Sequence, residues 1–550
     1  MSYLKVDRQA SSSTENKETD KESNEDLEVD NSKSVLLKIA TLYAEQLMSD
    51  LVLVVDGVSY PAHRLILCAS SEVFQIMLMN REWSEWRESR VVLTETPSAA
   101  SVFPLFLKYF YTGQIRISHQ TVLPVLSLAD KYNVKDLVTL CLSYMSSHIP
   151  HAAKRGQLIS WMQYTMACGH NHVARSCQNF VKWNLERVWS ECELDELEGE
   201  TLVQLLQQSD LVLHNEMSLY QFVVRWLTKQ RERLNNSDDL SEEEKRAHWE
   251  SLVPAVFSHI RFPMMCPNQL AKLLLCPLTQ EHKEFFMERM AIAMSYQSGQ
   301  YSLVWGPAAR AQLTPRLYTE DTWGAVLAVD NFHSLPCYHT RTFIFSSRSS
   351  IADVGLQDKL TEWTVDLYPK GVWFQKSLLI NWTRNYDVRP PIRYNMRTET
   401  IVPEVVLRTV RIAITCQNCP ESALDEYGEA DPMEEDVRVK IGILIWGVQK
   451  DVEHIASVVE RVHRFSPQNR VLNIDDALDF DELNTPLYTP PAALPAAPPA
   501  QTKRCSKCSE SGGFPEPCHL LGPDRDQLRI QVVILPLTDH CVVGPDSTLP

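Results

Sequence analysis

The feature that most constrains the fold lies between residues 49 and 113, where two short apolar runs flank a turn dipeptide. The first run is Leu51–Val55 and the second begins at Val58. Asp56-Gly57 stands between them, a pair that favours the tight primed turn of a β-hairpin. The segment therefore predicts two short antiparallel strands.

Helical patterns and one more strand follow this hairpin. Ser70 can cap a helix with one apolar face, formed by Val73, Phe74, Met77 and Leu78. We expect a third strand from Val91 to Leu93. Ser98 then precedes a helix whose apolar stripe ends at Gly113, and the helical period continues to His148. The pattern predicts a small sheet covered by helices.

Several residue blocks of this region match a known family in its order. They are Ser49-Asp50-Leu51, Pro61-Ala62-His63-Arg64 with Ser70, Phe74 and Met77, Phe110-Tyr111-Thr112-Gly113, and Leu128-Ala129-Asp130-Lys131-Tyr132. In these blocks the chain resembles the BTB/POZ domain. The next region resembles the α-helical BACK domain through Leu219-Tyr220-Gln221-Phe222, Arg225-Trp226-Leu227 and Ile260-Arg261-Phe262-Pro263.

A helix expected to be capped by Ser34 has an apolar stripe made of Leu36, Ile39, Ala40, Tyr43 and Leu47. The residues alone allow this stripe to cover its own domain. The BTB resemblance implies instead that it packs against a second subunit in a homodimer. It also implies that Asp50 and Arg64 face one another at the dimer interface, where such a pair specifies geometry more than it stabilises. Two solvated surface charges are the alternative.

The region after Tyr301 has strand-like segments in place of the helical period. They are Trp323 to Val329, Thr342 to Ser346, Trp363 to Leu367, Trp373 to Asn381, Leu407 to Cys416, Val437 to Trp446 and Leu528 to Leu535. This number of short strands predicts an antiparallel β-sandwich. The stretch Trp363-Thr364-Val365-Asp366-Leu367-Tyr368-Pro369-Lys370-Gly371, with the strand after it, resembles a TRAF-like (MATH-like) domain. That resemblance implies a module that binds a target protein, with an unrelated sandwich as the alternative.

The fold class is therefore α+β multidomain. We expect a disordered acidic tail at 1–33, a BTB/POZ domain at 34–149, a BACK domain at 150–297, a TRAF-like β-sandwich at 301–475 plus 528–538, a Pro-rich flexible loop at 484–527 and a tail at 539–550. The strand after the Pro-rich stretch is expected to return to the sheet, and a free tail is the alternative. This domain order resembles the group called BTB/POZ domain-containing protein 17.

Composition excludes several classes of function. The net charge of -17 disfavours binding to nucleic acid, which draws on clustered Lys and Arg. No window approaches the roughly 20 apolar residues of a membrane span. Residues 1–33 are polar and acidic, unlike a secretory signal, although the protein 17 group is expected to begin with one. We therefore expect a cytoplasmic protein, with the nucleus also compatible, and no disulfides among its 14 cysteines.

Trp83-Ser84-Glu85 fits the hydrophobic-x-Glu pattern with which related BTB adaptors engage cullin-3, so the resemblance implies cullin-3 as a partner. Tyr111 is expected at the same surface. In such a contact an apolar side chain enters a cleft of the partner while a carboxylate sets the register. The alternative is that Trp83 and Trp86 anchor a loop on their own domain.

Chemical motifs do not indicate an enzyme. The chain has no phosphate-binding loop, no nucleophile turn and no zinc-protease helix. Weak zinc-ligand candidates are Cys505, Cys508, Cys518 and His519, but their stretch offers no packed scaffold, so we expect neither metal nor cofactor. The sequence predicts a non-catalytic, dimeric substrate adaptor of a cullin-3 ubiquitin ligase. The alternatives are a scaffold in transcriptional or neuronal regulation without a ligase, and a secreted matrix-type protein if an upstream signal exists.

Overall fold

The computed structural model describes residues 30–190, 197–236, 241–299, 311–351, 360–375, 404–418, 436–484 and 518–537. The chain divides into two compact units. The first runs to Arg116 and includes Ser127–Lys135, and the second consists of Ile117–Leu126 and the chain from Asp136 onward.

The first unit contains a three-stranded sheet with strand order β2-β1-β3. Its elements are α1 (Ser32–Ala44), β1 (Leu51–Val55), β2 (Val58–Ala62), α2 (Arg64–Ser70), α3 (Glu72–Met79), η1 (Ser84–Trp86), β3 (Arg90–Leu93) and α4 (Pro97–Thr112). The predicted hairpin is present, because β1 and β2 pair antiparallel and both turn residues have positive φ, 48° at Asp56 and 77° at Gly57. Strand β3 joins β1 in parallel.

Aromatic rings fill the core of this unit. The ring of Phe74 stacks on Tyr132 at 4.6 Å between centroids, and Phe106 meets Phe110 edge to face at 5.0 Å. Phe74, Phe103 and Phe106 are fully buried. The predicted apolar faces therefore point inward as expected.

Three predicted helix caps are wrong by a few residues. The cap of α3 is Ser71, whose hydroxyl accepts a hydrogen bond from the Phe74 N–H, and not Ser70. The cap of α4 is Thr96, followed by a proline in the first helical turn, and not Ser98. Helix α1 begins before Ser34. Serines and threonines cluster at these boundaries, so composition alone does not select the residue with extended cap geometry.

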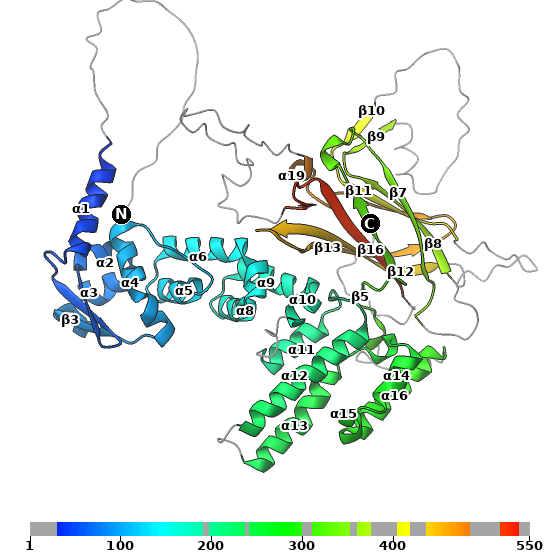
Figure 1. The fold of residues 1–550 in the computed structure, drawn as a ribbon, viewed down its shortest axis with the longest axis horizontal. Helices are drawn as coiled ribbons and strands as arrows, with labels where there is room; N and C mark the ends of the chain where they lie inside the picture. The colour runs from blue at the N-terminus through cyan, green and yellow to red at the C-terminus, as the bar shows by residue number, and fades with distance from the viewer. Residues whose placement is uncertain are drawn as a thin grey trace, which may run out of the picture. The chain divides into compact units, whose positions relative to one another are not determined.

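The second unit begins with helices. They are α6 (Lys135–Ser147), α7 (Ile149–Lys154), α8 (Leu158–Ala167), α9 (Asn171–Trp183), α10 (Leu185–Ser190), α11 (Gly199–Gln207), α12 (Glu216–Asn236), α13 (Glu242–Phe257), η3 (Phe262–Met264), α14 (Pro267–Leu273), α15 (Pro277–Glu281) and α16 (Lys283–Gln297), while α5 (Val122–Lys131) spans both units. Figure 1 shows α12 and α13 side by side. Within the described ranges, no helix is both long and apolar enough to cross a membrane.

Two antiparallel sheets follow the helices, as the sequence predicted, and lie against each other (Figure 1). One has the order β14-β11-β8-β7 and the other the order β13-β12-β16-β15, with β6 also paired to β16. The strands are β6 (Gly324–Val329), β7 (Arg341–Arg348), β8 (Leu360–Tyr368), β11 (Arg411–Cys416), β12 (Val437–Gln449), β13 (Val452–Phe465), β14 (Val471–Ile474), β15 (Leu520–Leu521) and β16 (Gln527–Pro536). Short strands β9 (Val372–Gln375) and β10 (Glu404–Leu407) form a separate pair, and β4 (Val212–Leu213) pairs in parallel with β5 (Leu317–Tyr318).

The core of the sandwich lies between the two sheets. Trp363 and Ile414 from one sheet are fully buried together with Ile443 and Val532 from the other. The late strand β16 pairs with both β12 and β6, which confirms the prediction that the chain returns to the sheet after the Pro-rich stretch.

Several sequence expectations in the sandwich are corrected. The single strand expected from Leu407 to Cys416 is two strands in different sheets. Residues 408–410 between them belong to no strand, and the Thr409 hydroxyl accepts the Asp476 N–H. Strands β13 and β14 were not predicted. Half-buried positions and several charges along β13 remove the clean alternation that marks a strand.

The predicted domain limits also change at the Pro-rich stretch. The predicted loop at 484–527 extends too far, since residues 518–527 include β15 and the buried Leu520 and Leu521. The sandwich core likewise extends past residue 475 to Leu483. The tail predicted at 1–33 ends too late, because Ser32 and Lys33 already belong to α1. Residues 1–29 of that tail, the predicted tail at 539–550, the end of the strand expected to Asn381 and the rest of the Pro-rich stretch lie outside the described residues.

A buried charged network joins the helices to the sandwich inside the second unit. Glu216 of α12 accepts hydrogen bonds from Arg316 Nε (3.3 Å), the Arg261 backbone N–H (2.8 Å) and the Tyr318 hydroxyl (2.8 Å). The side chains of Glu216 and Arg316 are fully buried. Lys440 of β12 adds bonds to the carbonyls of Ser209 and Pro315. The helical part and the sandwich therefore share one interior.

Candidate protein-interaction site

Helix α1 exposes a large apolar surface. Exposed fractions are 51% for Leu36, 73% for Leu37, 45% for Leu47 and 86% for Met48, and no residue of the helix is buried. Of the predicted interface residues, Ile39, Ala40 and Tyr43 are half-buried, whereas Leu36, Leu47 and Asp50 are exposed. A contiguous exposed apolar surface commonly marks an interaction site.

Tyr43 packs onto its own domain. Its hydroxyl donates to the Pro104 carbonyl of α4 (3.3 Å), and its ring lies 5.2 Å from that of Tyr111. The alternative of an inward-facing stripe is thus right for Tyr43. Leu37 and Met48, which the sequence analysis did not select, belong to the exposed side. The predicted stripe thus included residues of the inner face of the helix and left out exposed apolar residues beside it.

The prediction that Tyr111 shares an exposed surface with Trp83 is wrong. Tyr111 is only 1% exposed, and burial raises the pKa of its hydroxyl to about 12. Its oxygen accepts the backbone N–H of His63 (3.0 Å) and lies 3.0 Å from His63 Nδ1. Because the opposite ring nitrogen is 2.7 Å from the Leu47 carbonyl, which can only accept, the neutral ring has its proton on Nε2. Tyr111 and His63 therefore hold the end of α1 in place.

The Asp50 side chain contacts the backbone of Arg64, not its guanidinium group. The Asp50 carboxylate accepts the Arg64 N–H (2.9 Å) at the start of α2. The Arg64 guanidinium donates instead to the carbonyls of Leu78 (3.2 Å), Glu85 (3.5 Å) and Glu88. The predicted carboxylate–guanidinium pairing is thus replaced by a capped helix start and a guanidinium that braces the loop after α3. A sequence cannot distinguish these two uses of one arginine.

The loop that Arg64 braces contains Trp83-Ser84-Glu85. Trp83 is 49% exposed and directly precedes η1, so it does not anchor the loop. The Trp86 ring stacks within the loop itself, under the guanidinium groups of Arg81 (5.6 Å) and Arg87 (4.9 Å). The Ser84 hydroxyl donates to the Glu85 carboxylate (2.8 Å), and this bond lowers the pKa of Glu85. The loop therefore displays one aromatic side chain beside a stably ionised carboxylate.

The zinc candidates do not come together among the described residues. Cys505 and Cys508 lie outside them. Cys518 uses its backbone to bridge Val448, and its thiol is 3.7 Å from the Leu520 carbonyl. His519 lies 3.6 Å from a Glu482 oxygen. In the described ranges no three His, Cys, Asp or Glu side chains are arranged to hold a metal ion.

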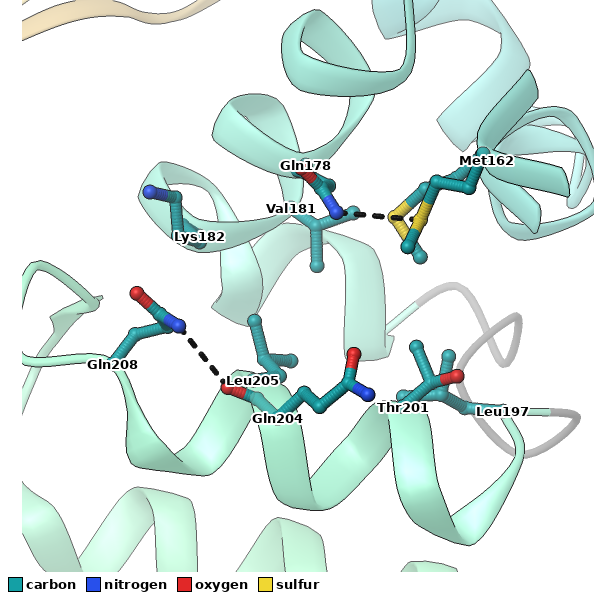
Figure 2. A pocket seen from close by; sticks show the side chains of 10 residues that line it. Met162, Gln178, Val181, Lys182, Leu197, Thr201, Gln204, Leu205 and Gln208 are labelled. Atoms are coloured by element: carbon teal, nitrogen blue, oxygen red, sulfur yellow. Dashed lines mark hydrogen bonds between the residues drawn. The ribbon is translucent and has the colours of Figure 1, made fainter. Parts of the chain in front are cut away.

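A cavity of about 160 Å³ lies between α8, α9 and α11, and the sequence analysis missed it. Figure 2 shows Val181 and Leu205 pointing toward one another across it. Apolar side chains from Met162 and Leu197 complete its walls, and polar ones surround them at Gln178, Thr201, Gln204 and Gln208. Gln178 Nε2 donates to the sulfur of Met166 at 3.2 Å. The cavity suits an apolar side chain flanked by polar groups. Its residues come from three helices, so no local pattern indicates it.

Strand β7 is an edge of its sheet. It pairs with β8 on one side, and the structure assigns no strand to its other side within the described residues. Ile344 in this strand is 74% exposed. An open edge with exposed apolar side chains can accept an added strand from a partner.

Comparison with known proteins shows which domain families the chain contains. Residues 40–149 match the BTB/POZ domain, residues 158–275 match the family described as BTB And C-terminal Kelch (BACK), and residues 313–538 match the BTBD17 TRAF domain. The chain is a BTB/POZ-BACK protein with a TRAF-like domain. It resembles the BTB/POZ domain-containing protein 17 group, and this confirms the resemblance based on the sequence.

Relatives of this BTB/POZ-BACK protein include BTB/POZ domain-containing protein 17 of Xenopus tropicalis, which is 27% identical over 58% of this chain and 62% of the relative. The Homo sapiens protein of the same name is 29% identical over 55% of this chain and 60% of its own length. Galectin-3-binding protein of Bos taurus is 24% identical over 54% of this chain and half of the relative. The matches thus span about three fifths of the protein 17 relatives. The domain order is typical of protein-interaction adaptors and indicates no catalytic family.

Proposed function

We propose that this protein is a homodimeric, non-catalytic adaptor that binds cullin-3 through its BTB domain and a target protein through its TRAF-like sandwich. The observation that carries the proposal is the exposed apolar face of α1 beside a rigid loop that presents Trp83. Tethering a target near a ubiquitin-carrying enzyme raises its effective concentration there, so the adaptor needs no catalytic group of its own. We place this activity in the cytoplasm, with the nucleus also compatible.

We propose a homodimer because exposing the apolar side chains of α1 to water is energetically unfavourable. Leu36 and Leu37 expose half or more of their surface on a helix whose inner face is already fixed by Tyr43. A second copy would cover this face and remove the exposed apolar area from water. Leu47 and Met48, which follow the helix, are exposed as well and would add to the apolar area that a second copy can cover.

Light scattering of the full chain after size-exclusion chromatography tests the dimer. We expect twice the chain mass of 63.0 kDa at micromolar concentration. Leu36→Asp should shift the protein toward one chain mass, because it places a charge in the apolar interface. Leu360→Asp is the matched control, since Leu360 of the sandwich has the same exposed fraction of 51%. A monomeric wild type, or a dimer unchanged by Leu36→Asp, would reject the α1 interface.

The cullin-3 part rests on the motif and on how the loop holds it. Trp83 is exposed while Arg64 and Trp86 fix the loop around it, so the indole is presented at low entropic cost. Glu85 stays ionised at neutral pH and can pair with a cationic or N–H donor group of the partner. These features are what an aromatic anchor with a register-setting charge requires.

Calorimetry with the purified amino-terminal domain of cullin-3 tests this contact. We expect Trp83→Ala to weaken binding by about tenfold or more, the usual effect of truncating an aromatic anchor. Trp373→Ala is the control, since Trp373 is 44% exposed and lies in β9 of the second unit. Equal affinity of wild type and Trp83→Ala would reject the proposed contact, and no binding by wild type would reject the ligase role.

We propose the open edge of β7 as the place where the sandwich binds its target by strand addition. Ile344→Lys should then abolish capture of targets, whereas a charge at Leu360 on β8 should not. Proximity labelling by the wild type and by Ile344→Lys, with and without proteasome inhibition, would identify targets and test the edge at once. Identical labelling by both proteins would place target binding elsewhere.

The second candidate function is a dimeric scaffold without a ligase. It is favoured by the departure of Trp83 from the methionine usual in the family motif. Affinity capture separates the two functions, because the adaptor recovers cullin-3 and the scaffold recovers only other partners.

A further inference from the structure

Three histidines lie together at the start of the helical part of the second unit. His119 stands shortly before α5, His148 stands at the start of α7, and His151 belongs to α7. The ring centroid of His119 lies 5.5 Å from that of His148 and 5.9 Å from that of His151, and the latter two are 6.4 Å apart. All three residues are half-buried. We call them the histidine cluster.

Aromatic rings from two neighbouring helices pack against the cluster. The ring of His148 stacks on Tyr144 of α6 at 4.1 Å, and the ring of His119 stacks on Trp161 of α8 at 6.1 Å. Nδ1 of His119 and Nδ1 of His151 are buried and have no hydrogen-bond partner among the described residues. A protonated imidazole donates from both nitrogens, so a proton taken up there would create a buried donor without an acceptor.

The charges around His119 also oppose its protonation. Burial lowers the pKa of this ring, and nearby positive charge lowers it further. The groups that supply this charge are Arg155 at the end of α7 and, when they are protonated, His148 and His151. No carboxylate is among them in the described part of the chain. A proton on His119 would therefore meet like charges and no counter-charge.

His148 is subject to the same two effects. Burial lowers its pKa, and the charges of Lys450 in the β12–β13 turn and of His151 lower it further. The contact of its Nδ1 with the Tyr144 carbonyl (2.8 Å) opposes this shift only in part. The Tyr144 hydroxyl supplies no counter-charge, because burial raises its pKa. The cluster therefore packs well only while its rings are neutral.

His119 lies in a segment, Ile117–Leu126, that belongs to the second unit although α5 from Ser127 onward belongs to the first. Inside the segment Val122 and Val125 are fully buried. If the segment were released, His119 would regain the ordinary histidine pKa of about 6.5, so acid favours the released state. The stabilisation by the neutral ring is complete above about pH 6.5 and declines as the pH falls below that value.

We propose that the histidine cluster is a pH-sensitive contact, which keeps residues 117–126 packed on the first BACK helices at neutral pH and releases them when the cluster is protonated. At the neutral pH of the cytoplasm the contact stays closed, and an acidic environment opens it. The cluster is separate from the residues assigned to the dimer, to cullin-3 and to target binding.

Hydrogen–deuterium exchange of the full chain, read by mass spectrometry at pH 7.5 and pH 5.5, tests this contact. Each rate is divided by the intrinsic exchange rate at the same pH. We expect peptides that cover residues 117–126 to exchange roughly threefold faster or more at the lower pH, because acid populates the released state. Equal corrected rates at the two pH values would overturn the proposal.

Substitutions separate the cluster from other titrating groups. His119→Phe keeps a ring against Trp161 but takes up no proton, so most of the acceleration in acid should disappear. Its control is His248→Phe, at an exposed position of α13. Arg155→Gln leaves all three rings in place and removes one cation, so it should weaken the acceleration, whereas Arg246→Gln on α13 should not. An acceleration that survives both His119→Phe and Arg155→Gln, or that is lost in either control, would overturn the assignment to the cluster.

Discussion

Replacing Glu216 by glutamine should destabilise the second unit far more than any surface charge change in the same helix. The substitution keeps the size of the side chain but removes its charge. Glu216 is the only acidic partner that a hydrogen bond gives to Arg316 in the described structure, and both side chains are fully buried. Arg261, 4% exposed, lies beside it, and burial lowers its pKa to about 10. The substitution therefore leaves the buried Arg316 guanidinium without its hydrogen-bonded counter-charge, and it removes one of the two carboxylates, Glu216 and Glu460, that favour the charged form of Arg261.

The size of the effect follows from this environment. Breaking a buried ion pair by removing one partner costs about 3–5 kcal/mol. Arg316 keeps its bonds to the carbonyls of Gln208 (2.6 Å), Leu206 (2.8 Å) and His259 (2.7 Å), so the lower half of this range applies to Glu216→Gln. The control is Glu232→Gln, since Glu232 also belongs to α12 but pairs with Lys229 at the surface. That exposed pair contributes at most about 0.5 kcal/mol.

Urea unfolding of the full chain measures both variants, because urea does not screen ion pairs as guanidinium chloride does. Circular dichroism follows the helices and indole fluorescence follows buried tryptophans such as Trp226 and Trp363. We expect both probes to report one transition of the second unit, displaced by about 3 kcal/mol in Glu216→Gln. A loss below 1 kcal/mol, or separate transitions of the helices and the sandwich, would refute the shared buried network.

Three further predictions concern the same unit. Burial lowers the pKa of His454 to about 4, so between pH 7.5 and pH 5 the unfolded chain binds a proton there that the folded chain does not bind. His454 should therefore lower the free energy of unfolding by about 2 kcal/mol over this range in urea titrations. The fall should be smaller by about that amount in His454→Gln, which keeps the contributions of other buried histidines such as His259 and His463. Asn184→Ala should lower the free energy of unfolding by about 2 kcal/mol, because it removes the side chain that binds both the N–H and the carbonyl of Ile455. An unchanged thermal transition would show that these two bonds do not stabilise the unit. Gly324→Ala should lower the free energy of unfolding by about 3 kcal/mol, since a Cβ there would lie 2.0 Å from the Val532 carbonyl oxygen. Gly199→Ala is the control and should be tolerated, because its nearest contact is at 3.5 Å. Equal stability of the two variants would show that β6 can move.

The sequence predicted elements wherever local chemistry was decisive. Asp56-Gly57 indicated the hairpin because few dipeptides adopt two positive φ angles. The apolar run of β16 indicated a buried strand even after a long Pro-rich stretch. Helix caps were harder to predict. Ser70 and Ser71 have the same side chain, and only the fold decides that Ser71 adopts the extended backbone of a cap.

The candidate site was only partly predictable for a related reason. The motif at Trp83 and the apolar character of α1 are local and were found. The direction of a side chain is not local, so Tyr111 was assigned to a surface although α1 and His63 bury it. The Arg64 guanidinium was assigned to Asp50 although three backbone carbonyls offered it better-placed acceptors.

The sequence by itself determined the order of the three domains, the turn and strand chemistry, and the absence of a catalytic motif, because periodicity and residue type act over a few neighbouring positions. Only the tertiary structure decided which face of α1 stays in water, that the BACK helices and the sandwich share a buried ion pair, and that a cavity forms between α8, α9 and α11. Glu216 and Arg316 are 100 residues apart, and Asn184 and Ile455, which also bind each other, are 271 apart. Such contacts depend on how whole elements pack, and no local pattern of residues specifies that packing.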